Sequence, residues 1–461
     1  MRGLSEPIPS TLLRMLLPIL ASHALRIAYQ WVDALWVRGL GVEATAAVTT
    51  SVFVMWWMYS LNDIFAIGVV AYVSQLLGAG ERDRAGAAAF LAVRGTLFLG
   101  LIGSAMGMFF ARDIFSLMTG EPGTLDAGTR YLSVVLAGSP MYLFVLTSEG
   151  VLRASGETRI PFLIDLFAIG INFALDPLLI YGFGVIPGFG VSGAAWATLI
   201  AQAIMAVSYI VLARRGHHAY PIRRTAPGPA VKLSGIFRVG LPAAFIGLLF
   251  SIVYIAFAAS AGEYGPAALA VVGIVNRLEA LEYLVAMAVG LAGAALVGQN
   301  LGARKPERAV QVIRLGTRWV VIYSAILSVF MMVFPEFFLS LFTSDPEALR
   351  LGVPYLRIVA WCFVFNGIEI VVAESILGSG HTVVISVIFG VFSLLRLPLA
   401  FIAPKLFGLE VLGIAWVIAI TCVVRSLVIV AWAMRGTWKR GLHTALQGAT
   451  GTDAAGSSST S

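Results

Sequence analysis

The chain has 461 residues, of which 59% are hydrophobic and 12% are charged, and its mean hydropathy is +0.91. Because soluble domains carry about 25% charged residues, this composition excludes an ordinary water-soluble fold and predicts a chain that lies mostly in lipid. The formal net charge of +7 does not indicate a nucleic-acid partner, because no basic face is interleaved with stacking aromatic residues. Cys362 and Cys422 fall within apolar segments and lack metal-ligand spacing, which argues against a disulfide or a zinc site.

Twelve apolar segments are long enough to cross about 30 Å of hydrocarbon, and six of them precede residue 214. These six lie near residues 12–37, 46–77, 86–111, 128–152, 159–183 and 191–213. The other six lie near residues 236–262, 267–301, 310–334, 351–377, 382–404 and 411–434. The first segment is too long for a signal peptide and lacks its cleavage site, so we expect it to remain as a helix. The sequence thus predicts an all-α polytopic membrane protein with twelve transmembrane helices.

The two sets of six segments repeat each other with an offset of 224 residues. The landmarks at this offset are Leu17-Pro18 with Leu241-Pro242, Gln75 with Gln299, and Ser155-Gly156 with Ser379-Gly380. An even number of helices returns the chain to its starting side, so the halves are parallel repeats related by an axis along the membrane normal. We therefore predict a first lobe at residues 1–213, a cytoplasmic linker at 214–235, a second lobe at 236–440 and a disordered tail at 441–461.

The distribution of charge predicts how the chain is oriented. When both termini and the connections after every second predicted helix are placed on one side, most of the 31 Lys and Arg residues lie there. Short connections rich in Lys and Arg remain in the cytoplasm. We therefore predict a multi-pass protein of the plasma membrane, with both termini in the cytoplasm.

Polar side chains interrupt the first predicted helix. Arg26, Gln30 and Asp33 lie on one helical face, because spacings of four and seven residues are close to one and two turns. An ionisable side chain at the bilayer centre costs about 2.5 to 3.5 kcal/mol, so each one is a candidate functional residue. Asp33 is therefore a candidate to bind a cation or to carry a proton. The alternative is a structural ion pair of Asp33 with Arg26 or with another residue.

The fifth predicted helix carries Asp165, Asn172 and Asp176, which are spaced so that all three face one side. A carboxylate and an amide one turn apart supply hard oxygen ligands to a small cation. Two nearby carboxylates can instead share a proton, because their repulsion favours protonation of one of them. The alternative for Asn172 and Asp176 is a hydrogen-bond network that only packs helices. Near the cytoplasmic interface, Glu149 and Arg153 have the i,i+4 spacing of an ion pair.

Four local motifs resemble the multidrug and toxic compound extrusion (MATE) family. They are Tyr72 to Gly80 (YVSQLLGAG), Leu152 to Thr158 (LRASGET), Asn172 to Leu178 (NFALDPL) and Gly193 to Thr198 (GAAWAT). The resemblance spans about residues 10–435 and implies a V-shaped pair of six-helix lobes. It also implies a secondary transporter that exports amphipathic, often cationic compounds by alternating access, in exchange for sodium ions or protons.

The resemblance assigns roles to residues of the first half. Asp33, Asn172, Asp176 and Thr198 match the cation site in the first lobe of the prokaryotic, DinF-like members. That site would take a proton or a sodium ion. Tyr29 matches a polar neighbour of the site.

Other residues of the first half are expected to support this site. Gln30, Arg26 and Asp165 would extend the polar network around it. Pro18 matches a proline at which the first helix is thought to bend, and it removes one intrahelical hydrogen bond. Its repeat partner Pro242 favours a purely architectural role as the alternative.

Two departures from the family pattern affect the expected coupling. The segment 236–262 contains no acid, whereas the NorM-like and eukaryotic members place a functional glutamate in the corresponding seventh helix. Whether the second half takes part in ion coupling stays open, because it contains four other acids: Glu279, Glu282, Glu369 and Glu374. Arg26 is the second departure, because a fixed positive charge near Asp33 favours the ionised carboxylate and opposes cationic substrates.

Two other functions compete with the antiporter. A flippase for lipid-linked precursors, from the same superfamily, shares the bundle, but those proteins commonly have more than twelve helices and a basic cleft. An intramembrane enzyme would need a catalytic motif such as HExxH, and no such motif occurs. We therefore expect a multidrug efflux antiporter that is not an enzyme, has no cofactor beyond its coupling ion, and works as a monomer on small amphipathic substrates.

Overall fold

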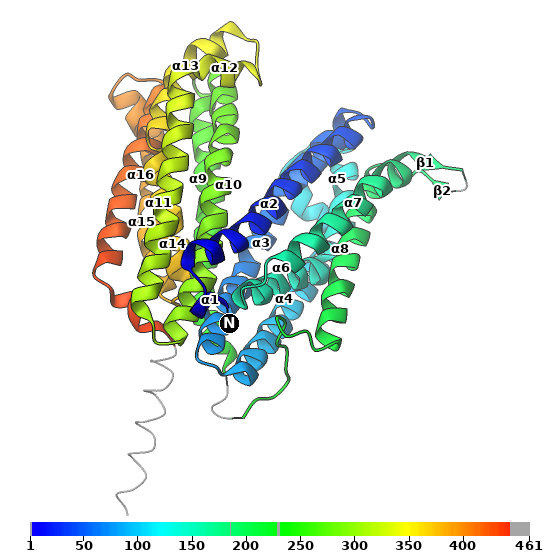
Figure 1. Cartoon of the computed structure of the whole chain (residues 1–461). Coiled ribbons are helices and arrows are strands. Elements are labelled where there is room, and N and C mark those ends of the chain that lie inside the picture. The colour runs from blue at the N-terminus through cyan, green and yellow to red at the C-terminus, as the bar shows by residue number, and fades with distance from the viewer. Residues whose placement is uncertain (1, 185, 228–230, 443–461) are drawn as a thin grey trace, which may run out of the picture. The chain divides into compact units, whose positions relative to one another are not determined.

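The computed structural model describes residues 2–184, 186–227 and 231–442. Within this part of the chain the architecture is helical, apart from one short antiparallel ladder in which β1 (Gly182–Phe183) pairs with β2 (Ile186–Pro187). Figure 1 labels the helices and strands along the chain. The tail that was expected to be disordered lies, from residue 443 onward, outside the described residues.

The helices follow the predicted apolar segments closely. In the first half they are α1 (Arg2–Ser5), α2 (Ile8–Arg38), α3 (Val42–Gly78), α4 (Arg82–Ser116), α5 (Pro122–Ala137), α6 (Ser139–Ala154), α7 (Arg159–Tyr181) and α8 (Val191–Arg214). In the second half they are α9 (Leu233–Gly262), α10 (Pro266–Gly302), α11 (Pro306–Val333), α12 (Pro335–Ser340), α13 (Pro346–Trp361), α14 (Phe363–Leu377), α15 (Thr382–Leu406), α16 (Val411–Met434) and a 3-10 turn, η1 (Thr437–Arg440).

Two of the predicted spans are bent pairs of helices rather than single helices. Ten helices are long and apolar enough to cross a membrane, and the pairs α5–α6 and α13–α14 bring the number to twelve if each pair is one span. The first pair bends by 51° at Gly138, where Pro140 lacks a backbone donor for the preceding turn. The second bends by 44° at Cys362, with no proline within four residues. The predicted all-α architecture is confirmed, with these two breaks added.

The contacts within the chain define two compact units, and their limits fall inside α2 and α9. One unit runs from Arg14 to Leu241, and the other combines the chain up to Leu13 with the chain from Pro242 onward. The limits lie within four residues of Pro18 in α2 and immediately before Pro242 in α9. The predicted lobe limits at residues 213 and 236 come from the sequence repeat and stay a prediction.

The start of α2 packs with the second half of the chain. Leu12 is fully buried, and the Arg308 guanidinium donates to the backbone carbonyl oxygens of Gly3, at 3.4 Å, and of Glu6. A positive side chain beside the last carbonyls of the short helix α1 offsets their partial negative charge. The segment before residue 14 is thereby fixed to the second half.

The start of α9 packs in the same way with the first half. The Phe237 ring meets the Phe65 ring edge to face, with centroids 5.2 Å apart. Gly240 approaches the backbone of Ile64 so closely that a Cβ there would lie 1.8 Å from the Ile64 carbonyl oxygen. A glycine is therefore required where α9 crosses α3.

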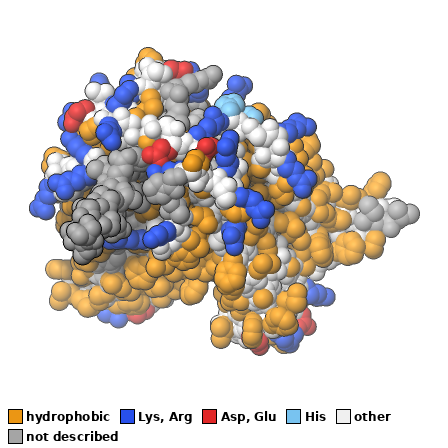
Figure 2. Space-filling view, turned by 90° about the horizontal axis from the view of Figure 1, so that it is seen from below, with side chains coloured by type: hydrophobic (Ala, Val, Ile, Leu, Met, Phe, Trp, Pro, Cys, Tyr) orange, Lys and Arg blue, Asp and Glu red, His pale blue; other side chains and the backbone are white. Residues whose placement is uncertain are grey.

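Large apolar side chains cover the outer faces of the helices. On α4, Phe98, Met108 and Phe109 are each about 70% exposed, at 68%, 71% and 71%. Figure 2 shows hydrophobic side chains over the flank of the molecule, with Lys and Arg gathered on the face turned to the viewer. Apolar patches of this extent are rare on soluble proteins. They mark the surface that contacts lipid.

Replacing Gly240 by alanine is expected to destabilise the protein by about 1 to 3 kcal/mol. The new methyl group would overlap the backbone of Ile64 in α3, and moving a helix backbone is costly. Gly170→Ala in α7 is the matched control, since nothing lies within 4 Å of its Cβ position. Alanine there should stabilise the helix by up to about 1 kcal/mol. Thermal unfolding in detergent measures both variants, and an unchanged melting temperature for Gly240→Ala would contradict the expected overlap.

Candidate functional site

Five polar side chains from three helices meet within the unit that runs from Arg14 to Leu241, and we call them the carboxyl ring. Tyr29 and Asp33 lie one turn apart on α2, and Asn172 and Asp176 lie one turn apart on α7. Thr198 comes from α8. The i,i+4 spacing places each pair on one face of its helix, so two helices supply four of the five groups.

A chain of hydrogen bonds closes the carboxyl ring. The hydroxyl oxygens of Tyr29 and Thr198 are 2.7 Å apart. With the Asn172 amide nitrogen turned toward Asp176, it donates to Asp176 Oδ2 at 3.1 Å, and the amide oxygen accepts from the Thr198 backbone N–H at 3.2 Å. The Asp33 carboxyl group is within hydrogen-bond contact of both the Asp176 carboxyl group and the Tyr29 hydroxyl. Two carboxyl groups in contact need a proton or a cation between them.

The carboxyl ring is buried and carries no arginine or lysine. Asn172 and Asp176 are fully buried and Thr198 is 4% exposed, whereas Asp33 is half-buried. One oxygen of each acid, the Oδ1 of Asp33 and of Asp176, has no hydrogen-bond partner. In the part of the chain that the structure describes, no Lys or Arg forms an ion pair with either acid. The ring therefore holds two acids and unused oxygen ligands but no positive charge.

The donor set fits a small hard cation or a proton rather than a transition metal. It consists of two carboxyl groups, one amide and two hydroxyl groups, all of which offer oxygen. Among the described residues, no group of three or more His, Cys, Asp and Glu side chains could hold a metal ion. Asp33, Asn172, Asp176 and Thr198 are thus brought together as the sequence predicted, and their role in ion binding stays a prediction.

A second charged cluster, which we call the Arg26 triad, joins α2, α6 and α7. The Arg26 Nη2 donates to both carboxylate oxygens of Asp165, each at 3.1 Å, and to Glu149 Oε1. Asp165 on α7 is 1% exposed, Glu149 on α6 is 13% exposed and Arg26 on α2 is 32% exposed. Two acids surround one base, so the ionised cluster carries one net negative charge.

The Arg26 triad shows which acids pair with Arg26, which the sequence left open. The structural ion pair considered for Asp33 with Arg26 is not present, because Arg26 is bound by Asp165 and Glu149 instead. Glu149 forms an ion pair with Arg26, and the charge of Arg153 also acts on it. Arg26 therefore adds no unbalanced positive charge beside Asp33. Helical spacing did not indicate Glu149 as a partner of Arg26, although an acid within a predicted membrane span was the available signal.

The remaining predicted residues of the first half lie outside both clusters. Gln30 is exposed, and the described structure does not bring it into the carboxyl ring or the Arg26 triad. α2 runs unbroken from Ile8 to Arg38, with Pro18 inside it. The predicted bending at Pro18 stays a prediction.

Acids of the second half also lie among helices. The Tyr254 hydroxyl of α9 donates to Glu279 Oε2 at 3.2 Å. Glu369 on α14 is fully buried, and Arg425 on α16 approaches its Oε1 at 2.6 Å. Glu374 is half-buried on α14. As the sequence indicated, α9 itself carries no acid between Leu233 and Gly262.

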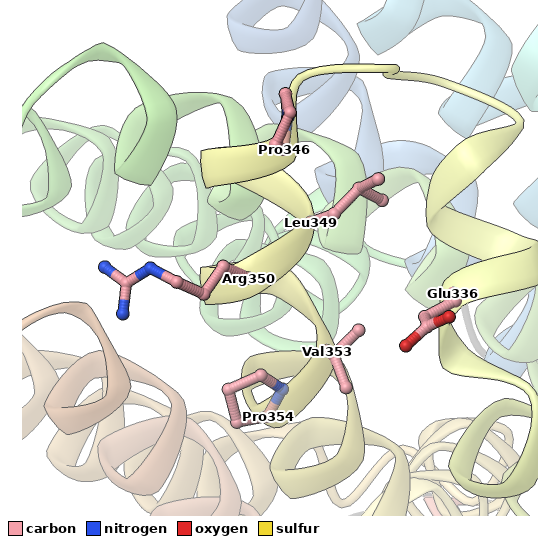
Figure 3. Close-up of a pocket in the computed structure, with 6 residues that line it drawn as sticks. All are labelled: Glu336, Pro346, Leu349, Arg350, Val353 and Pro354. Atoms are coloured by element: carbon pink, nitrogen blue, oxygen red, sulfur yellow. The ribbon is translucent and has the colours of Figure 1, made fainter.

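A cavity of about 480 Å³ lies in the second half, between α12 and the start of α13 (Figure 3). It is lined by Glu336, Pro346, Leu349, Arg350, Val353 and Pro354. Figure 3 shows the Arg350 side chain directed away from Glu336, and Arg350 forms an ion pair with Glu347 at 2.6 Å. Because the cavity is open and its charges are exposed or paired, it is a weaker candidate for ion binding than the carboxyl ring.

Comparison with protein families identifies relatives over almost the whole chain. The MatE family model matches residues 18–178 and 242–402. A protein from Bacillus subtilis named probable multidrug resistance protein YoeA is 28% identical over 92% of this chain and 93% of its own. A protein from Shewanella oneidensis named FAD transporter is 28% identical over 89% of this chain and 92% of its own.

A solved structure shares the fold. It is described as a MOP superfamily transporter from Pyrococcus furiosus, and it superimposes with a TM-score of 0.86. The match covers 94% of this chain and 97% of that chain at 22% sequence identity. The two matched segments of the family model begin 224 residues apart, which is the offset of the internal repeat.

Proposed function

Because the chain belongs to the MatE family of membrane transporters, which are not enzymes, we propose that it is a secondary active multidrug efflux antiporter. It exports amphipathic, often cationic small molecules in exchange for protons or sodium ions, and the carboxyl ring is its ion site. The observation that carries this proposal is the contact between two acids, the half-buried Asp33 and the fully buried Asp176, with no ion pair from a Lys or Arg among the described residues to either.

The electrostatics of the ring explain why it would bind an ion. Two carboxylates in contact inside a membrane are costly when both are ionised, and a proton or a monovalent cation offsets their repulsion. The unpartnered Oδ1 atoms of Asp33 and Asp176 supply free lone pairs for that ion. Loading and unloading of the ring therefore change the net charge shared by α2 and α7.

A change in charge between α2 and α7 can drive alternating access. The loaded ring holds the two helices together through the proton or cation, whereas the empty ring leaves like charges in contact. α2 would respond by bending near Pro18, where one helical hydrogen bond is missing. Ion binding at the carboxyl ring and bending of α2 would thus be coupled.

The energy of one ion is sufficient for export. A tenfold gradient of the coupling ion releases about 1.4 kcal/mol. A potential of 100 mV adds about 2.3 kcal/mol per charge when the substrate is uncharged, because exchange of one monovalent ion for a monovalent cation moves no net charge. A tenfold gradient of substrate requires about 1.4 kcal/mol. A single coupled ion can therefore sustain a modest outward gradient of substrate.

The Arg26 triad has two acids and one base, and the charge of Arg153 also acts on Glu149, so the position has no excess of positive charge that would oppose cationic substrates. It likewise has no excess of basic groups that would favour an anionic lipid-linked precursor. The resemblance to a protein named FAD transporter favours a flavin dinucleotide as a second candidate substrate. A transport assay can compare the two substrate classes directly.

We expect efflux of a fluorescent amphipathic cation from proteoliposomes when an inward gradient of protons or of sodium ions is imposed. Empty liposomes and vesicles with an ionophore that collapses the gradient are the controls. Parallel vesicles loaded with FAD test the second candidate. If neither gradient moves either compound, the antiporter proposal fails.

The same proteoliposomes can be used to determine the orientation of the protein in the membrane. We propose that the protein is a monomer of the plasma membrane with both termini in the cytoplasm, since most of its Lys and Arg lie on the connections assigned to that side. A cysteine added in the connection between α8 and α9 should react with an impermeant maleimide only from the cytoplasmic side. Reaction from the outer side would reverse the topology.

A further inference from the structure

One face of α11 carries two arginines with no partner in the protein. Arg314 and Arg318 lie one turn apart and are both exposed. Within the part of the chain that the structure describes, neither guanidinium group forms an ion pair or a hydrogen bond. The acid of α11, Glu307, pairs with Lys439 instead, at 3.3 Å. Two positive charges therefore lie side by side with no acid to balance them.

The two arginines lie close to one edge of the hydrocarbon layer. A helix rises about 1.5 Å per residue, so Arg314 lies about 28 Å and Arg318 about 22 Å before the end of α11 at Val333. The hydrocarbon layer is about 30 Å thick, so both positions are near its edge on the side of the preceding, Lys- and Arg-containing connection. Side chains on a helix tilt toward its N-terminus, and long arginine side chains extend to the headgroups. Both guanidinium groups can therefore reach the phosphate layer.

Further along α11, the same face is apolar and exposed. Ile322 is 52% exposed, Ile326 is 54% exposed and Val329 is 59% exposed. Steps of three and four residues continue the line that starts at Arg314. This face thus has a positively charged end at the headgroup layer and an apolar strip in the hydrocarbon layer. A phospholipid with a negatively charged headgroup has the complementary charge at one end and apolar chains at the other.

The corresponding helix of the first half has only one of the two arginines. α4 and α11 start 224 residues apart, so Arg94 corresponds to Arg318. The residue that corresponds to Arg314 is Phe90, and the Arg94 guanidinium lies 6.0 Å from the centroid of its ring. The ring face attracts a cation. In α11 a second arginine replaces that ring, and like charges at this spacing repel each other. An anion bound by both arginines offsets the repulsion.

We propose that this face of α11 binds one anionic phospholipid of the cytoplasmic leaflet. Its phosphate group is held by Arg314 and Arg318, and an acyl chain lies along Ile322 and Ile326. Planar guanidinium groups bind phosphate oxygens through paired hydrogen bonds. Negatively charged lipids of the cytoplasmic leaflet attract basic side chains near the membrane surface. The inference does not rest on the antiporter function proposed above, because lipid binding is measured without transport.

Lipid binding to the purified protein gives the first test. Native mass spectrometry in detergent can compare phosphatidylglycerol, which is anionic, with phosphatidylcholine of the same acyl chains, which is zwitterionic. We expect wild type to prefer phosphatidylglycerol by about 30-fold, which corresponds to about 2 kcal/mol, or about 1 kcal/mol for each arginine. The double variant Arg314→Gln, Arg318→Gln should lose at least about tenfold of this preference. A double variant with the wild-type preference would overturn the proposal.

Arg224→Gln, Arg435→Gln is the matched control, because it removes the same charge from exposed positions outside α11. Arg224 lies in the connection between α8 and α9, and Arg435 directly follows α16. This control should keep the wild-type preference for phosphatidylglycerol. An equal loss in the control and in the α11 double variant would show that the total charge of the protein selects the lipid. That result would also overturn the proposal.

The single variants cover the case in which the α11 double variant does not fold. Arg314→Gln and Arg318→Gln should each lower the preference by about fivefold, because each removes about half of the attraction. The wild-type preference in both folded single variants would contradict the site.

The same spectra test two other occupants of this face. A wild-type dimer that dissociates in the single variants would assign the face to a second copy of the chain. Binding of free glycerol phosphate as tight as that of phosphatidylglycerol would show that the acyl chains contribute nothing. Either result would overturn the proposal, whereas a monomer that retains phosphatidylglycerol and not glycerol phosphate would support it.

Discussion

Asp33→Asn and Asp176→Asn are each expected to lower gradient-driven export by about 100-fold or more, which corresponds to at least about 2.7 kcal/mol of coupling energy. An amide has nearly the same size as a carboxyl group, but it cannot exchange a proton and it offers no charge to a sodium ion. Since the two acids are in contact, loss of either one removes the shared ion. Rates of efflux from proteoliposomes under the effective gradient measure the loss.

Asp126→Asn is the matched control for these variants. Asp126 pairs with Arg112 at 2.9 Å, but both side chains are more than half exposed. Exposed ion pairs contribute about 0 to 1 kcal/mol, so this substitution should leave export unchanged. Substrate binding measured without a gradient should persist in all three variants. An Asp33→Asn protein that exports at the wild-type rate would remove the carboxyl ring from the mechanism.

Arg26→Met is expected to destabilise the protein by about 3 kcal/mol, the lower end of the range for breaking a buried ion pair. The substitution leaves Asp165, which is 1% exposed, and Glu149, which is 13% exposed, without their shared base. The lower end applies because Arg26 itself is 32% exposed and water partly screens its charge. Thermal unfolding in detergent at neutral pH measures the change.

Removing the acids together with the base should restore most of this stability. The triple variant Arg26→Met, Glu149→Gln, Asp165→Asn leaves no uncompensated charge, and it is therefore expected to unfold closer to wild type than Arg26→Met alone. Arg26→Lys should give an intermediate result, because an ammonium group cannot bridge two acids as a planar guanidinium does. Equal melting temperatures for Arg26→Met and wild type would show that the Arg26 triad does not stabilise the fold.

The sequence predicted groupings along one helix well and pairings between helices poorly. Helical spacing placed Asn172 with Asp176 on one face, and the structure adds Asp33 from another helix to that pair. The same spacing placed Arg26 with Asp33, but seven residues rise by about 10 Å along a helix. The two side chains therefore lie at different depths, and each finds partners on other helices. Such partners depend on packing that spacing does not encode.

Of the two breaks in membrane spans, the sequence indicates one and not the other. Hydropathy alone described residues 128–152 and 351–377 as single segments, because apolar side chains continue through both bends. Pro140 is a readable signal for the first break. The second break, at Cys362, has no proline or glycine within four residues and follows from tertiary packing.

The attachment of the first residues to the second half has a consequence for synthesis of the chain. Arg308, which holds the carbonyl oxygen of Glu6, follows it by 302 residues. At about 5 to 20 residues per second, a ribosome needs roughly 15 to 60 s to reach it. The amino-terminal segment must wait through the insertion of most of the membrane helices before its partner exists. A ribosome that stops before α11 therefore leaves this segment open to proteases, however well the earlier helices are inserted.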